Sequence, residues 1–116
     1  MMGRTVPVSL ESAMKMGEAL PGVVRTTSWG APALKVRGQM MACVPTNKSA
    51  EPGSLVIRVN RRDREAMLAE RPDLFYLPDH YAGYDGILVR LKACDAAMMR
   101  DLMAMAHRFV KAGNRE

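Results

Sequence analysis

The sequence is poor in the residues that build covalent or metal-bound frameworks. It contains two cysteines in 116 residues. Neither Cys43 nor Cys94 belongs to a Cys-x-x-Cys pair or has a histidine at metal-ligand spacing. This pattern argues against a disulfide scaffold and a structural zinc, and it is typical of unpaired thiols in a reducing compartment. We therefore expect neither a metal nor a cofactor.

Long apolar runs are also missing. Glu11, Lys15 and Glu18 interrupt the region where a signal peptide or a membrane span needs an unbroken apolar block. We expect a cytoplasmic protein with no membrane partner. A length of 116 residues with 48% apolar and 25% charged residues is typical of one globular domain. We predict that residues 1–116 form it.

Aromatic residues are few, and acidic residues are fewer than basic ones. Aromatics make up 5% of the chain, whereas eleven methionines predict an adaptable core. The net charge is +5 and the pI is near 9.6. Such a charge favours a polyanionic partner, although it says nothing about the fold.

Hydrophobic periodicity and turn residues divide the chain into helices and strands. The expected elements are a helix capped by Ser9, a strand over 23–29, a hairpin over 33–44 turning at Arg37–Gly38, a strand over 54–59, a helix capped by Asn60, strands over 74–77 and 87–91, and a helix capped by Asp95. The order α-β(3–4)-α-β2-α is dominated by hairpins. It predicts the α+β class, with two layers, a mainly antiparallel sheet, helices on one face and the other face left to solvent.

Three packing details follow from these patterns. The hairpin register pairs Leu34 with Met41 and places Cys43 on the same face as both. The second helix has a narrow apolar stripe, chiefly Met67 and Leu68. The last helix has a longer stripe that leaves His107 outside it and exposed, made of Met98, Leu102, Met105, Ala106 and Phe109.

Basic residues recur on the strand positions assigned to the solvent face and in the first turn of the second helix. Cations at a helix start oppose the helix dipole, so local stability does not explain them. The expected nucleic-acid-binding set is Lys35, Arg37, Arg58, Arg61, Arg62, Arg64, Arg90 and Lys92. Such a set predicts nonspecific, salt-sensitive contact with phosphates and no chemistry on the substrate. The competing interpretation is a solvated charged face.

The loop between the last two strands concentrates aromatic and polar residues. The residues of a candidate ligand pocket are Trp29, Asp79, His80, Tyr81 and Tyr84. A small-molecule binder or enzyme centred on His80 is therefore an alternative. No nucleophile motif accompanies His80, so we expect a non-enzymatic protein, and a histidine that merely ties the loop down is also consistent. Trp29 could equally stack on a base or anchor the core.

Several stretches together resemble the MmcQ/YjbR family. They are LPGV at Leu20, TSWGAPALKVRGQMMA at Thr27, residues 61–72, and LFYLPDHYAGYDGILVRL at Leu74. The resemblance covers roughly residues 10–111. It implies a two-layer fold related to CyaY-like and secretion-chaperone domains, with hairpins directed towards nucleic acid, DNA rather than RNA. It also implies an alternative role as a protein-interaction module of the secretion-chaperone kind, working as a homodimer.

Overall fold

Three α-helices and six strands make up residues 6–113, which are the residues that the computed structural model describes. The ends of the predicted domain 1–116 lie outside them. The elements are α1 (Leu10–Glu18), β1 (Val23–Ser28), β2 (Ala31–Val36), β3 (Gln39–Cys43), β4 (Ser54–Arg58), α2 (Arg61–Glu70), β5 (Phe75–Tyr76), the 3-10 turn η1 (Asp79–Tyr81), β6 (Gly86–Arg90), the 3-10 turn η2 (Leu91–Ala93) and α3 (Ala96–Lys111). The predicted element order is confirmed.

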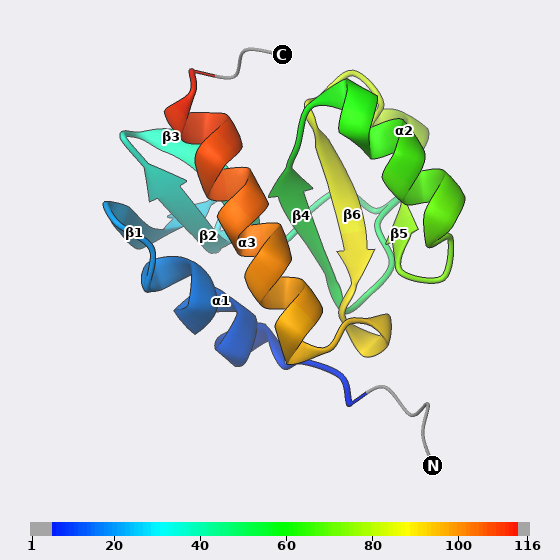
Figure 1. Cartoon of the computed structure of the whole chain (residues 1–116), viewed down its shortest axis with the longest axis horizontal. Coiled ribbons are helices and arrows are strands. Elements are labelled where there is room, and N and C mark those ends of the chain that lie inside the picture. Colours follow the sequence, from blue (N-terminus) through cyan, green and yellow to red (C-terminus); the bar gives the residue numbers. More distant parts are fainter. Residues whose placement is uncertain (1–5, 114–116) are drawn as a thin grey trace.

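The strands form one open antiparallel sheet in the order β1-β2-β3-β4-β6-β5. Helices α1 and α3 cross one face of this sheet, and α2 packs beside β5 and β6 (Figure 1). The α+β class with an antiparallel sheet is therefore confirmed. No helix within residues 6–113 has both the length and the apolarity needed to cross a membrane.

The three helices begin where the sequence predicts. The side chains of Ser9, Asn60 and Asp95 each accept a hydrogen bond from the backbone N–H three residues later. Each bond satisfies one of the amide donors that a helix start leaves unpaired. These caps are local signals, which is why the sequence alone locates them.

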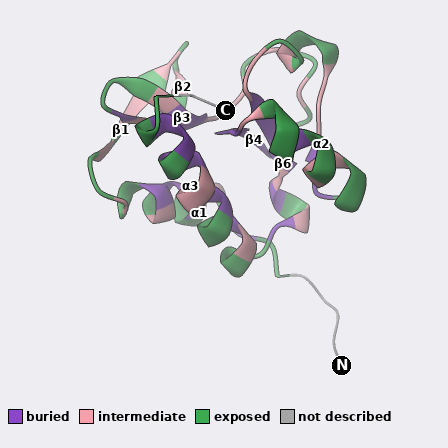
Figure 2. Cartoon of the chain, turned by 45° about the horizontal axis from the view of Figure 1, so that its top comes forward, coloured by how far each residue is buried: buried purple, intermediate pink, exposed green. Residues whose placement is uncertain are grey.

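The core lies between the sheet and helices α1 and α3, where the buried residues gather (Figure 2). Gly17 lets α1 approach the sheet closely. A Cβ atom at this position would lie 2.3 Å from Leu34 Cδ1 and 3.1 Å from Met103 Sδ. Both neighbours are almost fully buried, at 0% and 1% exposure, so neither has free space to move into.

A β-bulge corrects the expected hairpin register. The structure pairs Lys35 with Met40 but Leu34 with Ala42, so one step along β2 spans two residues of β3. Met41 is the extra residue, and the expected Leu34–Met41 pair does not form. Because a bulge breaks the alternation of side chains, Cys43 leaves the core face and turns to the opposite side of the sheet.

Helix α3 is buried more widely than a single stripe predicts, because it contacts both α1 and strands β2, β3 and β4. His107 is 7% exposed, which corrects the expectation that it faces solvent. Its Nε2 lies 2.8 Å from the carbonyl oxygen of Pro21, in the turn between α1 and β1. The buried apolar residues of the helix are Met99, Leu102, Met103, Ala106, Phe109 and Val110.

The second sheet face is not the open basic surface that the strand pattern predicts. Val56 and Leu88 lie on this face with 1% and 0% exposure, because side chains from the β3–β4 and β5–β6 loops lie over it. Arg58, expected on this face in solvent, is 8% exposed. The buried residue of α2 is Arg64, whereas Met67 and Leu68 are only half-buried.

The substitution Gly17→Ala is expected to destabilise the protein by about 1–3 kcal/mol, the usual effect of an extra methyl group in a filled core. The added Cβ must displace Leu34, and this outweighs the smaller gain in helix propensity. Urea denaturation measures the change. Gly83→Ala is the control, because no atom lies within 4 Å of its Cβ position. Equal stability of the two variants would contradict the close approach of α1 to the sheet.

Candidate functional site

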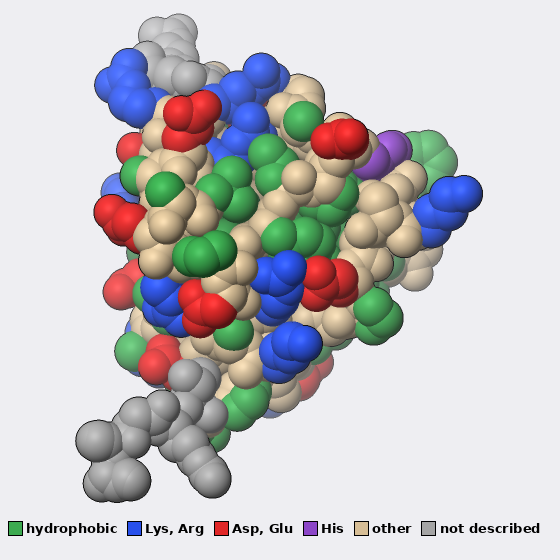
Figure 3. Space-filling model, turned by 90° about the vertical axis from the view of Figure 1, so that its right-hand side faces the viewer, with side chains coloured by type: hydrophobic (Ala, Val, Ile, Leu, Met, Phe, Trp, Pro, Cys, Tyr) green, Lys and Arg blue, Asp and Glu red, His purple; other side chains and the backbone are tan. Residues whose placement is uncertain are grey.

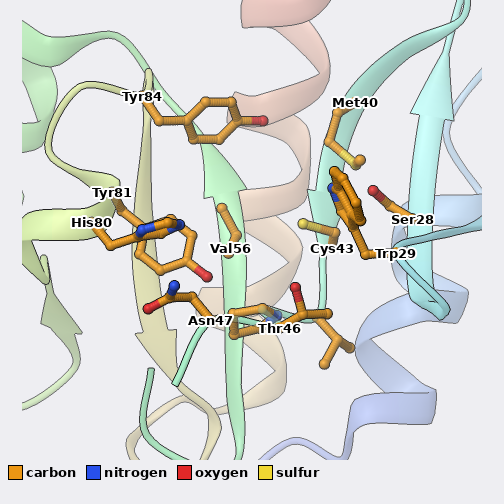
Figure 4. Close-up of a pocket in the computed structure, with 12 residues that line it drawn as sticks. Ser28, Trp29, Met40, Cys43, Thr46, Asn47, Val56, His80, Tyr81 and Tyr84 are labelled. Atoms are coloured by element: carbon orange, nitrogen blue, oxygen red, sulfur yellow. The ribbon is translucent and has the colours of Figure 1, made fainter. Parts of the chain in front are cut away.

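A cavity of about 640 Å³ lies on the sheet face opposite α1 and α3 (Figure 4). Its volume falls within the range of small-molecule pockets. Its lining comes from the end of β1 and the turn after it, from β3 and the loop that follows, from β4, and from the β5–β6 loop. The lining residues are Ser28, Trp29, Met40, Cys43, Val44, Pro45, Thr46, Asn47, Val56, His80, Tyr81 and Tyr84.

Trp29 stands at the rim in an unusual conformation. It is 91% exposed, so it does not anchor the core. Trp29 and Gly30 form the β1–β2 turn with φ values of 55° and 79°. A two-residue hairpin turn with two positive φ angles favours Asn or Gly, and a bulky residue there is strained. Local stability therefore does not explain a tryptophan at this position.

His80 and Tyr81 form the opposite wall, across the cavity from Trp29 (Figure 4). Their rings meet edge to face, with centroids 4.9 Å apart and planes at 79°. Asn47 and Tyr81 both line the cavity, so the β3–β4 loop adjoins this wall. Asp79 is exposed and does not line the cavity. The structure thus gathers four of the five residues expected at a pocket.

The position of Tyr84 depends on Gly86 and Arg58. A Cβ at position 86 would lie 3.0 Å from two carbons of the Tyr84 ring, so glycine allows the ring to lie against the sheet. The guanidinium carbon of Arg58 lies 4.8 Å from the centre of that ring and 5.3 Å from the centre of the Phe109 ring. Arg58 also donates hydrogen bonds to the carbonyl oxygens of Asp85 and Met40, at 2.8 and 3.2 Å. It therefore holds one wall of the cavity to the sheet.

Three arginines from β4 and α2 donate hydrogen bonds to the β5–β6 loop, and we call them the arginine clamp: Arg58, Arg61 and Arg64. Arg61 donates to the Gly83 carbonyl at 2.6 Å and to the Asp85 carboxylate at 2.7 Å. Arg64 donates to three backbone carbonyls, those of residues 82, 84 and 86, at 2.7–3.2 Å. The clamp thus fixes residues 82–86. This segment carries Tyr84 and directly follows His80 and Tyr81 in the same loop.

The cavity lining carries no aspartate, glutamate, lysine or arginine among the residues that the structure describes. Burial raises the pKa of the Cys43 thiol to about 11. Burial also raises the pKa of the Tyr81 and Tyr84 phenols. These three groups are therefore protonated and neutral at physiological pH, and the cavity offers hydrogen bonds and aromatic surface rather than charge.

The eight cations expected to bind nucleic acid separate into two groups. Four have partners inside the molecule: the three clamp arginines, and Arg90, which pairs with Glu51 at 2.8 Å and stacks on the Tyr76 ring. The other four make no hydrogen bond or salt bridge within residues 6–113 and come from β2, the β2–β3 turn, α2 and η2: Lys35, Arg37, Arg62 and Lys92. On the face shown in Figure 3, basic and acidic side chains are interspersed.

Sequence reasoning missed the part of the cavity contributed by β3 and the loop after it. Cys43 reaches the cavity because of the bulge, for which the hairpin sequence gives no signal. Asn47 lies in the loop between β3 and β4. Its Oδ1 accepts the Ser49 N–H at 2.9 Å, and this Asx turn folds the loop back over the sheet. The Asn-Lys-Ser sequence signals the turn but not its direction.

Comparisons with known proteins agree on the fold. The YjbR family model matches residues 18–109. The crystal structure of the Deinococcus radiodurans protein DR2400, which has a domain called DUF419, is similar with a TM-score of 0.73 at 16% identity, over 93% of this chain and 82% of that one. No curated protein matches the chain.

The substitution Arg64→Met is expected to lower the free energy of unfolding by at least about 1.5–3 kcal/mol, the value of one charge-assisted hydrogen bond. It removes the donor from three carbonyl oxygens, one of them in a buried hydrogen bond and two in partly buried ones. Arg62→Met is the matched control, since Arg62 lies two residues away, exposed and without a hydrogen-bond or ion-pair partner in residues 6–113, and should change stability by less than about 0.5 kcal/mol. Similar losses in both variants, measured by urea denaturation, would refute the clamp.

Stability should also fall at alkaline pH. The pKa of Cys43 and that of Cys94 are each raised by burial from 9.0 to about 11. The unfolded chain therefore releases these protons at lower pH than the folded chain, and the unfolding free energy declines from about pH 9 to pH 11. A Cys43→Ala, Cys94→Ala double variant should show a shallower decline in denaturation curves across that range. An unchanged slope would contradict the burial of the thiols.

Proposed function

The chain belongs to the YjbR family, and we propose that it binds a small organic molecule in the cavity on the second sheet face. The observation that carries this proposal is the single tryptophan of the chain. Trp29 is 91% exposed, takes a left-handed backbone conformation and stands at the rim of the cavity. Backbone strain of this kind is retained at ligand sites, where the side chain serves a purpose other than stability.

The structure also supports a preformed site. The arginine clamp holds the segment 82–86 through six hydrogen bonds, five of which go to backbone carbonyls. A wall fixed in this way loses little conformational entropy when a ligand arrives. Apolar and aromatic walls with a few hydroxyl and amide groups match the usual composition of a small-molecule pocket.

We propose that the cavity binds its ligand without catalysing a reaction. Burial raises the pKa of Cys43 to about 11, so its thiol is protonated near neutral pH. A protonated thiol is a poor nucleophile. The cavity therefore offers contact surface rather than an activated group.

The substitution Trp29→Asn is expected to weaken the binding of an anilinonaphthalene dye about 2- to 10-fold, which corresponds to one aromatic contact. Asparagine tolerates the left-handed conformation, so the variant should be at least as stable as the wild type. Dye fluorescence gives the affinity, and thermal unfolding gives the stability.

Arg37→Asn is the matched control for this experiment. Arg37 has the same φ of 55°, precedes a glycine at the other hairpin tip and does not line the cavity. Its substitution should leave dye binding unchanged. Equal losses in both variants, or no loss with Trp29→Asn, would reject the cavity as the binding site.

Weak nucleic-acid binding is a second candidate function. It is favoured by the net charge of +5 and by the four cations that make no hydrogen bond or salt bridge to the part of the chain that the structure describes. If all four contact duplex phosphates, the logarithm of the binding constant should fall with the logarithm of salt with a slope near −3 to −4. Fluorescence anisotropy of labelled duplex DNA over a salt series measures it. Absence of binding at low salt would exclude this function.

A further inference from the structure

We infer that the cavity takes an uncharged, planar heteroaromatic ring, seated between Trp29 and the His80–Tyr81 wall. This inference rests on the proposed cavity binding and names the chemical class of its ligand. The ring could belong to a free small molecule such as a nucleoside, or to a base of a single-stranded nucleic acid. Both sources present the same ring chemistry to the cavity, and the experiment below separates them.

Aromatic faces and edges dominate two opposite walls. Trp29 stands on one side and His80 and Tyr81 on the other, with Val56 at the floor (Figure 4). Flat rings stack on aromatic side chains, whereas a saturated ring of equal size gains only the burial of its surface. The thioether of Met40 adds a polarizable contact beside the tryptophan. The walls therefore favour planar ligands over puckered ones.

The lining also selects against charge. No lysine, arginine, aspartate or glutamate among the described residues lines the cavity, so an ionised group inside it would lose water without gaining a permanently charged counter-ion. Arg58 is the nearest candidate, because its guanidinium stacks on Tyr84. It is 8% exposed, however, and donates to the carbonyl oxygens of Asp85 and Met40. A phosphate or carboxylate on the ligand must then lie outside the cavity.

Polar groups in the lining explain why the ring should carry nitrogen or oxygen atoms. Ser28, Thr46 and Asn47 bring two hydroxyls and an amide to the cavity. The Oδ1 of Asn47 already accepts the Ser49 N–H, which leaves its amide N–H groups to donate to a ligand acceptor. A pure hydrocarbon ring would cover these groups without pairing them, which is unfavourable. A heteroaromatic ring edge satisfies them.

The test compares four ligand classes on the full chain. They are uncharged nucleosides with purine or pyrimidine rings, saturated cyclic alcohols of similar size, benzoate as a charged planar ring, and single-stranded hexanucleotides with or without bases. Because Trp29 is the only tryptophan, its fluorescence reports directly on the cavity rim. Amide chemical shifts of Asn47, His80 and Tyr81 confirm the location and serve for variants that lack the tryptophan.

The expected result is that uncharged nucleosides, or bases within the hexanucleotide, bind at least 10-fold tighter than the saturated alcohols and benzoate. Trp29→Asn should weaken that binding about 5- to 150-fold, the range for loss of one stacking side chain. Arg37→Asn should leave the nucleoside affinity unchanged. Binding of nucleosides identifies a free small molecule as the source. Binding only of the base-containing hexanucleotide identifies a nucleic acid.

Two results would overturn the inference in distinguishable ways. If saturated alcohols or benzoate bind the cavity as tightly as the heteroaromatic compounds, the ring preference is wrong while cavity binding stands. If none of the four classes changes the amide shifts of the cavity residues, the ring preference is again wrong. In that case the anilinonaphthalene dye decides separately whether the cavity binds small molecules at all.

Discussion

The contact between the arginine clamp and the backbone of residues 82–86 is the interaction on which the site depends. A guanidinium has five N–H donors in one plane, so a single side chain can satisfy several carbonyl oxygens that a strand cannot reach. Arg64 uses this property on three carbonyls and is buried without a carboxylate partner among the described residues. The charge-assisted bonds offset the unfavourable burial of its charge. Together with the bonds of Arg61, they attach the loop that carries His80, Tyr81 and Tyr84 to α2.

The same clamp changes how the positive charge of the chain should be understood. Arg61 and Arg64 lie in the first turn of α2, where they oppose the helix dipole, and the sequence gives no local reason for them. Their partners lie about twenty residues further along the chain, in the β5–β6 loop. A cation that is unfavourable for its own helix is therefore favourable for the tertiary structure. A net charge of +5 consequently overstates the charge available to a polyanionic partner.

Three local departures from a regular antiparallel sheet build the cavity. The turn at Trp29 is strained, the bulge at Met41 moves Cys43 to the second face, and the glycine at position 86 leaves room for the Tyr84 ring beside its backbone. Each departure weakens the regular pattern of strand and turn. Together they place cavity walls around Val56, on a sheet face that would otherwise be exposed to solvent. Irregular positions in an ordinary scaffold are where binding surfaces are usually found.

The sequence by itself determined the order of the elements, the caps at Ser9, Asn60 and Asp95, and the hairpin turn at Arg37–Gly38, because these features depend on residues within a few positions of one another. It also brought Trp29, His80, Tyr81 and Tyr84 together as a candidate pocket from their residue types. The tertiary structure alone decided the bulge in β3, the burial of His107 against Pro21 and the partners of the clamp arginines. These contacts join segments distant in the chain, and their energies depend on burial and geometry that no local pattern records.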